Sequence, residues 1–107
     1  MRRVALLAAL WLSPVCFADG AKVDAEAAKS LIVQNFCNAC HDAEMKMLGP
    51  AYKDVAGKYR SDKDALEKLS AKVRKGGSGV WGEVPMPANP GVKDEELKTI
   101  LTWVLTL

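Results

Sequence analysis

Residues 35–41 read Asn35-Phe36-Cys37-Asn38-Ala39-Cys40-His41 and contain the pattern C-x-x-C-H. This pattern is the attachment signature of a c-type haem. Cysteines at this spacing lie about one helical turn apart, so both sulfurs can reach the two vinyl groups on one side of a porphyrin. His41 would then lie under the ring, where its imidazole can bind the iron. The pentapeptide alone also fits a redox dithiol or half of a zinc site, so other features must distinguish these possibilities.

The supply of donor side chains argues against zinc. A structural zinc ion needs four ligands, usually cysteine and histidine. Apart from Cys16, the chain has only Cys37, Cys40 and His41, which is one donor too few. A thioredoxin-like dithiol is expected in a βαβ context, and we predict no strand before the motif. Haem is therefore the favoured interpretation, and a dithiol protein remains the non-haem alternative.

The first 18 residues have the anatomy of a secretory signal peptide. A short basic start precedes an apolar run at 4–12, and small residues precede a cleavage site after Ala18. The run is shorter than the roughly 20 residues that span a bilayer. We therefore expect export, cleavage near Ala18, no membrane insertion afterwards, and a single domain at 19–107. A lipid on Cys16 is disfavoured, because Pro14-Val15 fits a lipoprotein cleavage site poorly.

The charge balance excludes one class of partner. The whole chain carries a formal charge of +2, but loss of Arg2 and Arg3 with the leader leaves 13 basic side chains against 13 acidic ones. Two haem propionates would make the protein slightly acidic. The sequence therefore gives no support for binding to nucleic acid or to an acidic membrane surface.

Apolar periodicity predicts an all-α domain. The expected helices are short and cover residues 24–36, 51–58 and 63–75, with a last one that begins near Asp94. We predict no strand, and we interpret the glycine-rich residues 76–79 as a flexible turn. A domain of this size has only a modest apolar core of its own. A covalently held porphyrin, which is large and mostly apolar, would supply the missing centre.

The sixth position on the iron must come from a donor other than histidine, because His41 is the only imidazole in the chain. Met45 and Met47 follow His41 too closely to round the porphyrin edge, and we expect them to pack as apolar side chains. Met86 lies far enough downstream to reach the opposite face. It stands between two prolines, whose fixed φ angles reduce the conformational freedom lost on ligation. Met86 is thus the predicted ligand. The alternative is a haem enzyme or gas sensor in which this position is open.

Several further motifs occur together in the mature part of the chain. They are Met47–Ala56, Gly79–Gly82, Pro85–Pro87 and Asn89. This combination resembles the small bacterial class I cytochromes c of the cytochrome c-551 (c8) type, and the resemblance extends over essentially all of residues 19–107.

The resemblance implies a fold, a cofactor and a function. The fold is the all-α cytochrome c fold, with about four short helices wrapped around one haem c. The haem would be held by thioethers from Cys37 and Cys40, with His41 and Met86 as axial ligands. The function would be periplasmic one-electron transfer by a monomer that is not an enzyme. Expected partners are redox proteins such as a nitrite reductase, a terminal oxidase or a cytochrome bc complex.

The resemblance also assigns supporting roles. The carbonyl of Pro50 would accept the proton on the far nitrogen of His41, which fixes the tautomer. The indole N–H of Trp81 would bind a haem propionate, and Asn89 would donate to the sulfur of Met86.

Two positions depart from the family pattern. Ala88 stands where a second proline is common, which would loosen the ligand loop around Asn89. Lys72 stands where an arginine often approaches the propionates, and lysine keeps the charge without the fork geometry.

Overall fold

The computed structural model describes residues 23–107, so the predicted leader lies outside the described residues. Four helices follow one another in this part of the chain: α1 (Ala25–Gln34), α2 (Tyr52–Tyr59), α3 (Ala65–Lys75) and α4 (Asp94–Val104). The prediction of a mostly helical domain with about four short helices is confirmed. None of the helices within residues 23–107 is long and apolar enough to cross a membrane.

A small antiparallel hairpin corrects the prediction that the chain has no strand. It consists of β1 (Gly77–Gly79) and β2 (Gly82–Met86), with Gly77 paired to Met86 and Gly79 to Gly82. The glycine-rich stretch at 76–79 therefore pairs with a partner strand for most of its length and is not merely a flexible turn. The sequence lacks the β-branched alternation that indicates a strand. Positive φ angles at Gly77, Gly79 and Gly82 produce the hairpin instead.

Local chemistry fixes the ends of the helices. The carboxylate of Asp24 accepts a hydrogen bond from the backbone N–H of Ala27 at 2.9 Å and so caps α1. Gly76, at φ +66°, ends α3 in the left-handed region. Three acidic residues in the first turn of α4 lie near its positive dipole end. These signals explain why the helix positions could be predicted closely.

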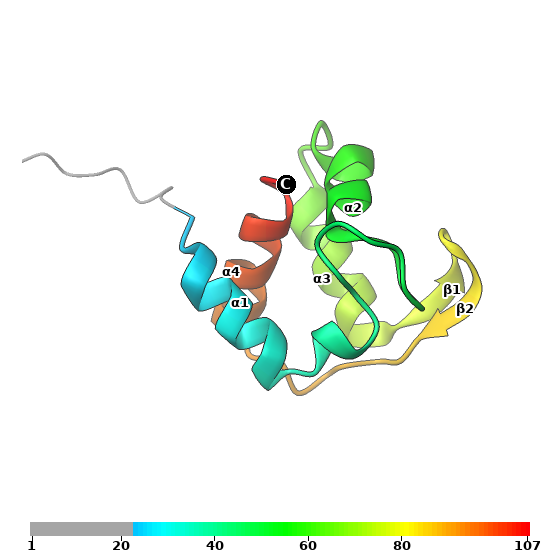
Figure 1. Cartoon of the computed structure of the whole chain (residues 1–107), viewed down its shortest axis with the longest axis horizontal. Coiled ribbons are helices and arrows are strands. Elements are labelled where there is room, and N and C mark those ends of the chain that lie inside the picture. Colours follow the sequence, from blue (N-terminus) through cyan, green and yellow to red (C-terminus); the bar gives the residue numbers. More distant parts are fainter. Residues whose placement is uncertain (1–22) are drawn as a thin grey trace, which may run out of the picture.

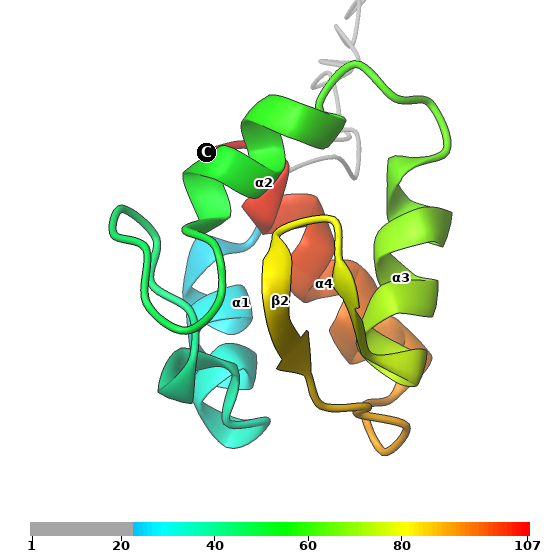
Figure 2. The same cartoon turned by 90° about the vertical axis from the view of Figure 1, so that its right-hand side faces the viewer.

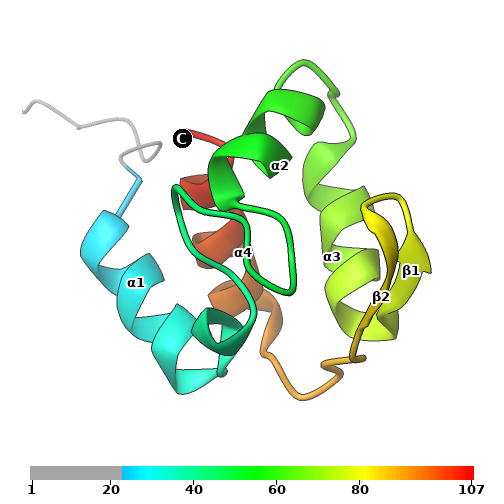
Figure 3. The same ribbon diagram turned by 45° about the vertical axis from the view of Figure 1, so that its right-hand side comes forward.

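The core lies where the other helices pack against α4. Figure 1 shows α1 crossing α4, with α3 on the other side, and α2 also contacts α4. The hairpin lies beside the C-terminal end of α3 in the two rotated views (Figures 2 and 3). The largest buried side chains come from these helices and from the segment before α4: Ile32, Tyr52, Val55, Leu69, Val92, Leu97, Ile100, Leu101, Trp103 and Val104. The connection at 40–51 and the hairpin lie on opposite sides of a cavity.

Candidate functional site

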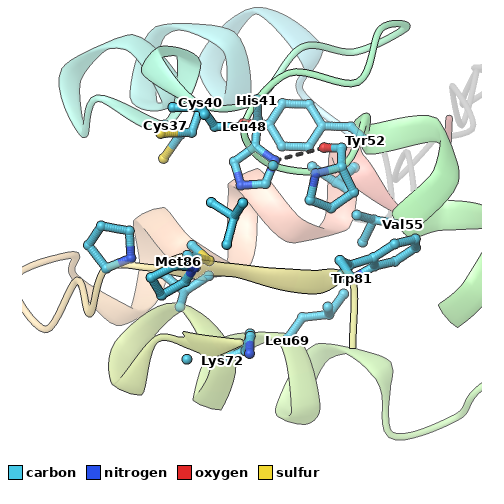
Figure 4. A pocket seen from close by; sticks show the side chains of 18 of the residues that line it. Cys37, Cys40, His41, Leu48, Tyr52, Val55, Leu69, Lys72, Trp81 and Met86 are labelled. Carbon is cyan, nitrogen blue, oxygen red and sulfur yellow. Dashed lines mark hydrogen bonds between the residues drawn. The ribbon is translucent and has the colours of Figure 1, made fainter. Parts of the chain in front are cut away.

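A cavity opens between the connection that follows α1 and the hairpin (Figure 4). Side chains of α3, α4 and the start of α2 form its inner wall, and most of them are aliphatic. The aliphatic part of this wall consists of Val55, Leu69, Val73, Val92, Leu97, Ile100, Leu101 and Val104. The cavity brings together six of the seven predicted site residues: Cys37, Cys40, His41, Pro50, Trp81 and Met86.

The two cysteines lie on the same side of the cavity (Figure 4). Residues Cys37–Ala39 form a single turn of 3₁₀ helix, and the N–H groups of Cys40 and His41 both donate to the carbonyl of Cys37. Both cysteine side chains are half-buried. Burial raises the pKa of the Cys37 thiol above its ordinary value.

His41 projects into the cavity with one ring nitrogen already engaged. Its Nδ1 lies 2.8 Å from the carbonyl oxygen of Pro50. Because a carbonyl can only accept, Nδ1 carries the proton and Nε2 is left with a free lone pair. This is the tautomer that a metal-ligating histidine requires, and the hydrogen bond makes the imidazole a better donor.

Gly49 is a site residue that the sequence reasoning did not single out. A Cβ atom at this position would lie 2.4 Å from Cε1 of His41, which is closer than real Cβ atoms come to other atoms. The N–H of Gly49 also donates to the carbonyl of Cys40 at 2.8 Å. In the sequence Gly49 is one residue of the Met47–Ala56 motif, and nothing there indicated a contact with the histidine. The absence of a side chain here lets the backbone pass directly against the imidazole.

Tyr52 was also missed as a site residue. Its ring stacks on His41 with 5.2 Å between ring centroids and 19° between planes. Its hydroxyl is buried and has no hydrogen-bond partner among the described residues. Burial raises the pKa of Tyr52 far above its ordinary value, so the hydroxyl keeps its proton. Tyrosine beside a helix start is a common core residue, and nothing in its sequence position pointed to the histidine.

Met86 is the last residue of β2, and its half-buried side chain faces the cavity from the side opposite His41 (Figure 4). Met45 and Met47 do not line the cavity. The expectation that they pack as apolar side chains was wrong, because they are 66% and 45% exposed. They lie in the irregular connection before α2.

Of the remaining residues singled out from the sequence, two line the cavity and one does not. Trp81 occupies the turn of the hairpin at the cavity wall, with the amine of Lys58 5.9 Å from its ring centroid. Lys72 also lines the cavity. Asn89 does not line the cavity. Its backbone N–H donates to the carbonyl of Val73 at 2.8 Å and anchors the chain after Met86 to α3.

Comparison with known proteins decides the family. The sequence profile of the family described as Cytochrome c matches residues 25–107. The chain belongs to the cytochrome c family. Cytochrome c-552 of Hydrogenobacter thermophilus is 43% identical over 107 residues, which cover 100% of this chain and 99% of that protein. Cytochrome c-551 of Pseudomonas aeruginosa is 44% identical over 82 residues, or 77% of this chain and 78% of that protein.

A solved structure supports the same assignment for this cytochrome c. The crystal structure of wild-type Nitrosomonas europaea cytochrome c552 superposes with a TM-score of 0.70 and 47% identity. The match covers 74% of this chain and 98% of that one. The resemblance to class I cytochromes c of the c-551 type, and the cytochrome c fold that it implied, are confirmed.

The cofactor of this cytochrome c is one haem c, attached covalently through Cys37 and Cys40. The chain's own residues fit that group. The cavity wall is largely aliphatic, as a porphyrin face requires, and the two thiols lie next to the one imidazole with a free Nε2. The protein is an electron carrier of the monohaem c-551/c-552 group and not an enzyme, as the sequence resemblance implied.

Proposed function

We propose that this cytochrome c carries single electrons in the periplasm through a haem iron bound by His41 and Met86. One observation carries the proposal. His41 and Met86 come from distant parts of the chain and extend into the same cavity from opposite sides (Figure 4). The Pro50 carbonyl engages Nδ1, which directs Nε2 of His41 to the remaining partner, the iron.

The bound haem supplies a centre that accepts and releases one electron. The chain's residues set how readily it does so. The soft thioether of Met86 favours the ferrous state relative to a second nitrogen ligand. The aliphatic wall acts in the same direction, because it disfavours the additional positive charge of ferric haem. Both proposed ligands are held by hydrogen-bonded backbone, so little rearrangement opposes electron transfer.

Three further residues have proposed roles around the same group. Trp81 and Lys72 both line the cavity. We assign the indole N–H of Trp81 to a haem propionate, with the charged amine of Lys72 as a second donor to the propionates. Asn89 is proposed to donate to the sulfur of Met86. Its backbone bond to Val73 supports this role, because it holds the residues after Met86 in a defined position.

Export to the periplasm is proposed from residues 1–18. The basic start, the apolar run at 4–12 and the small residues before the cleavage site support this proposal, with cleavage near Ala18. We propose a monomer whose partners are redox proteins such as a nitrite reductase, a terminal oxidase or a cytochrome bc complex.

Replacement of Met86 tests the ligation. Met86→Ala should open one face of the iron, lower the reduction potential, and let the ferrous protein take up carbon monoxide rapidly at neutral pH. The matched control is Met45→Ala, since Met45 is 66% exposed and lies outside the cavity. The control should keep the parent spectrum and potential.

The same experiment distinguishes the carrier from a sensor or enzyme with an open iron position. If the parent ferrous protein already binds carbon monoxide as fast as Met86→Ala does, the open-site alternative is correct. An unchanged visible spectrum in Met86→Ala would reject Met86 as the ligand.

A further inference from the structure

The His41–Pro50 hydrogen bond does not by itself fix the plane of the imidazole. A carbonyl oxygen accepts hydrogen bonds over a broad range of directions, so the ring can tilt while it keeps this bond. A second restraint is therefore needed to hold one ring orientation. The structure offers it in Tyr52, whose ring is nearly parallel to that of His41.

We propose that Tyr52 is a positioning residue that sets the plane of the His41 imidazole through ring stacking. The inference rests on the proposed function, because it requires His41 to be an iron ligand. The centroid distance of 5.2 Å and the 19° angle between planes correspond to offset stacking, one of the two arrangements that aromatic rings prefer. Gly49 restricts the same ring at Cε1, where even a Cβ atom would not fit.

Tyr52 is suited to this task because it is itself immobilised. It is the first residue of α2, and its backbone N–H donates to the carbonyl of Asp42 at 2.9 Å. Its ring meets that of Trp103 edge-on, with 6.1 Å between centroids and 76° between planes. Only 8% of the residue is exposed. A tilt of His41 would therefore have to displace a packed aromatic pair.

The orientation of an axial imidazole has an electronic consequence. Its π orbitals interact with the iron orbitals that lie in the same direction, so the ring plane, together with the orientation of the other axial ligand, determines how unpaired spin is distributed over the porphyrin in ferric haem. The proton NMR shifts of the haem methyl groups report that distribution. A change of the ring plane therefore changes these shifts, and it does so independently of electron-transfer activity.

The test compares three variants of the ferric holoprotein by proton NMR. Tyr52→Leu removes the stacked ring, and the order or the spread of the haem methyl shifts should change. Tyr52→Phe keeps the ring and removes only the unpartnered hydroxyl, so the parent pattern should be retained. Tyr59→Leu is the control, because Tyr59 is a half-buried tyrosine of the same helix that packs against the same core without stacking on His41.

Each result has a defined meaning. The inference is overturned if Tyr52→Leu keeps the parent methyl pattern while both axial ligands stay bound, or if Tyr52→Phe or Tyr59→Leu changes it as much. A parent protein without histidine ligation would overturn the proposed function instead. If Tyr52→Leu does not yield holoprotein, nuclear Overhauser contacts between the ring protons of Tyr52 and His41 test the stacking instead. We expect these contacts in the diamagnetic ferrous parent, and their absence would also overturn the inference.

Discussion

Three residues hold the imidazole of His41, and each acts on a different part of it. The Pro50 carbonyl engages Nδ1, the Tyr52 ring covers a face, and the Gly49 backbone lies against Cε1. The C-x-x-C-H motif and His41 could be predicted from the sequence because their chemistry depends on local spacing, whereas the role of Pro50 was implied only by the resemblance to a known family. Gly49 and Tyr52 could not, because their roles depend on how the connection folds back over the histidine.

Gly49→Ala should disturb the packing of the backbone against the His41 imidazole. The added methyl group would lie 2.4 Å from the ring, so the imidazole or the backbone must move. Overpacking of this kind costs about 1–3 kcal/mol. We expect a lower yield of holoprotein and a lower free energy of unfolding in urea.

The matched control is Gly57→Ala in the middle of α2, where nothing lies within 4 Å of the added atom. Alanine should stabilise the protein there by about 0.4–1 kcal/mol, since it restricts the unfolded chain. Equal effects of the two substitutions would contradict the tight contact at Gly49.

Among the elements, the hairpin positions the proposed ligand. Gly76 ends α3 at φ +66°, and a Cβ atom there would lie 2.4 Å from the carbonyl oxygen of Met86. The close approach brings the end of β2 back to the end of α3. The helices could be predicted because apolar period and capping residues act locally. The hairpin could not, because its strands form through glycine geometry and pairing rather than through strand propensity.

The start of α3 gives a prediction about pH. Asp62 accepts hydrogen bonds from the Lys68 amine at 2.5 Å and from the backbone N–H of Asp64 at 2.8 Å. These contacts lower the pKa of the Asp62 carboxyl below its ordinary value. Their stabilising contribution is therefore complete above the unfolded pKa of about 3.9 and is lost as the pH falls through the lower, folded pKa.

Urea unfolding of Asp62→Asn at several pH values checks this sign. The variant should be less stable than the parent at pH 7, and the difference should shrink below about pH 4. Asp54→Asn is the control, because Asp54 has no ion pair among residues 23–107. A difference for Asp62→Asn that grows toward acid pH would show that the sign is wrong.

Across the whole molecule, the core and the cavity share a wall. Leu69, Leu97, Ile100, Leu101 and Val104 belong to the buried core and also line the cavity. A domain of this length buries only about 60–65% of the surface that its unfolded chain exposes, so its stability from apolar burial is small. The haem therefore supplies a part of the core that the chain lacks.

A variant that cannot attach haem tests this dependence. Cys37→Ala/Cys40→Ala, purified free of haem, should lose most of its helical circular dichroism and unfold without a cooperative transition. The holoprotein measured in parallel should unfold in a single transition. Cooperative melting of the haem-free variant with parent-like helix content would contradict the shared core.

The far-red absorption spectrum of the oxidised protein shows whether the iron is held between an imidazole and a thioether. Sulfur bound to ferric haem produces a weak charge-transfer band in this region. We expect that band in the parent protein and its loss in Met86→Ala. A coloured parent protein that lacks the band would contradict methionine ligation, and a colourless one would contradict the haem itself.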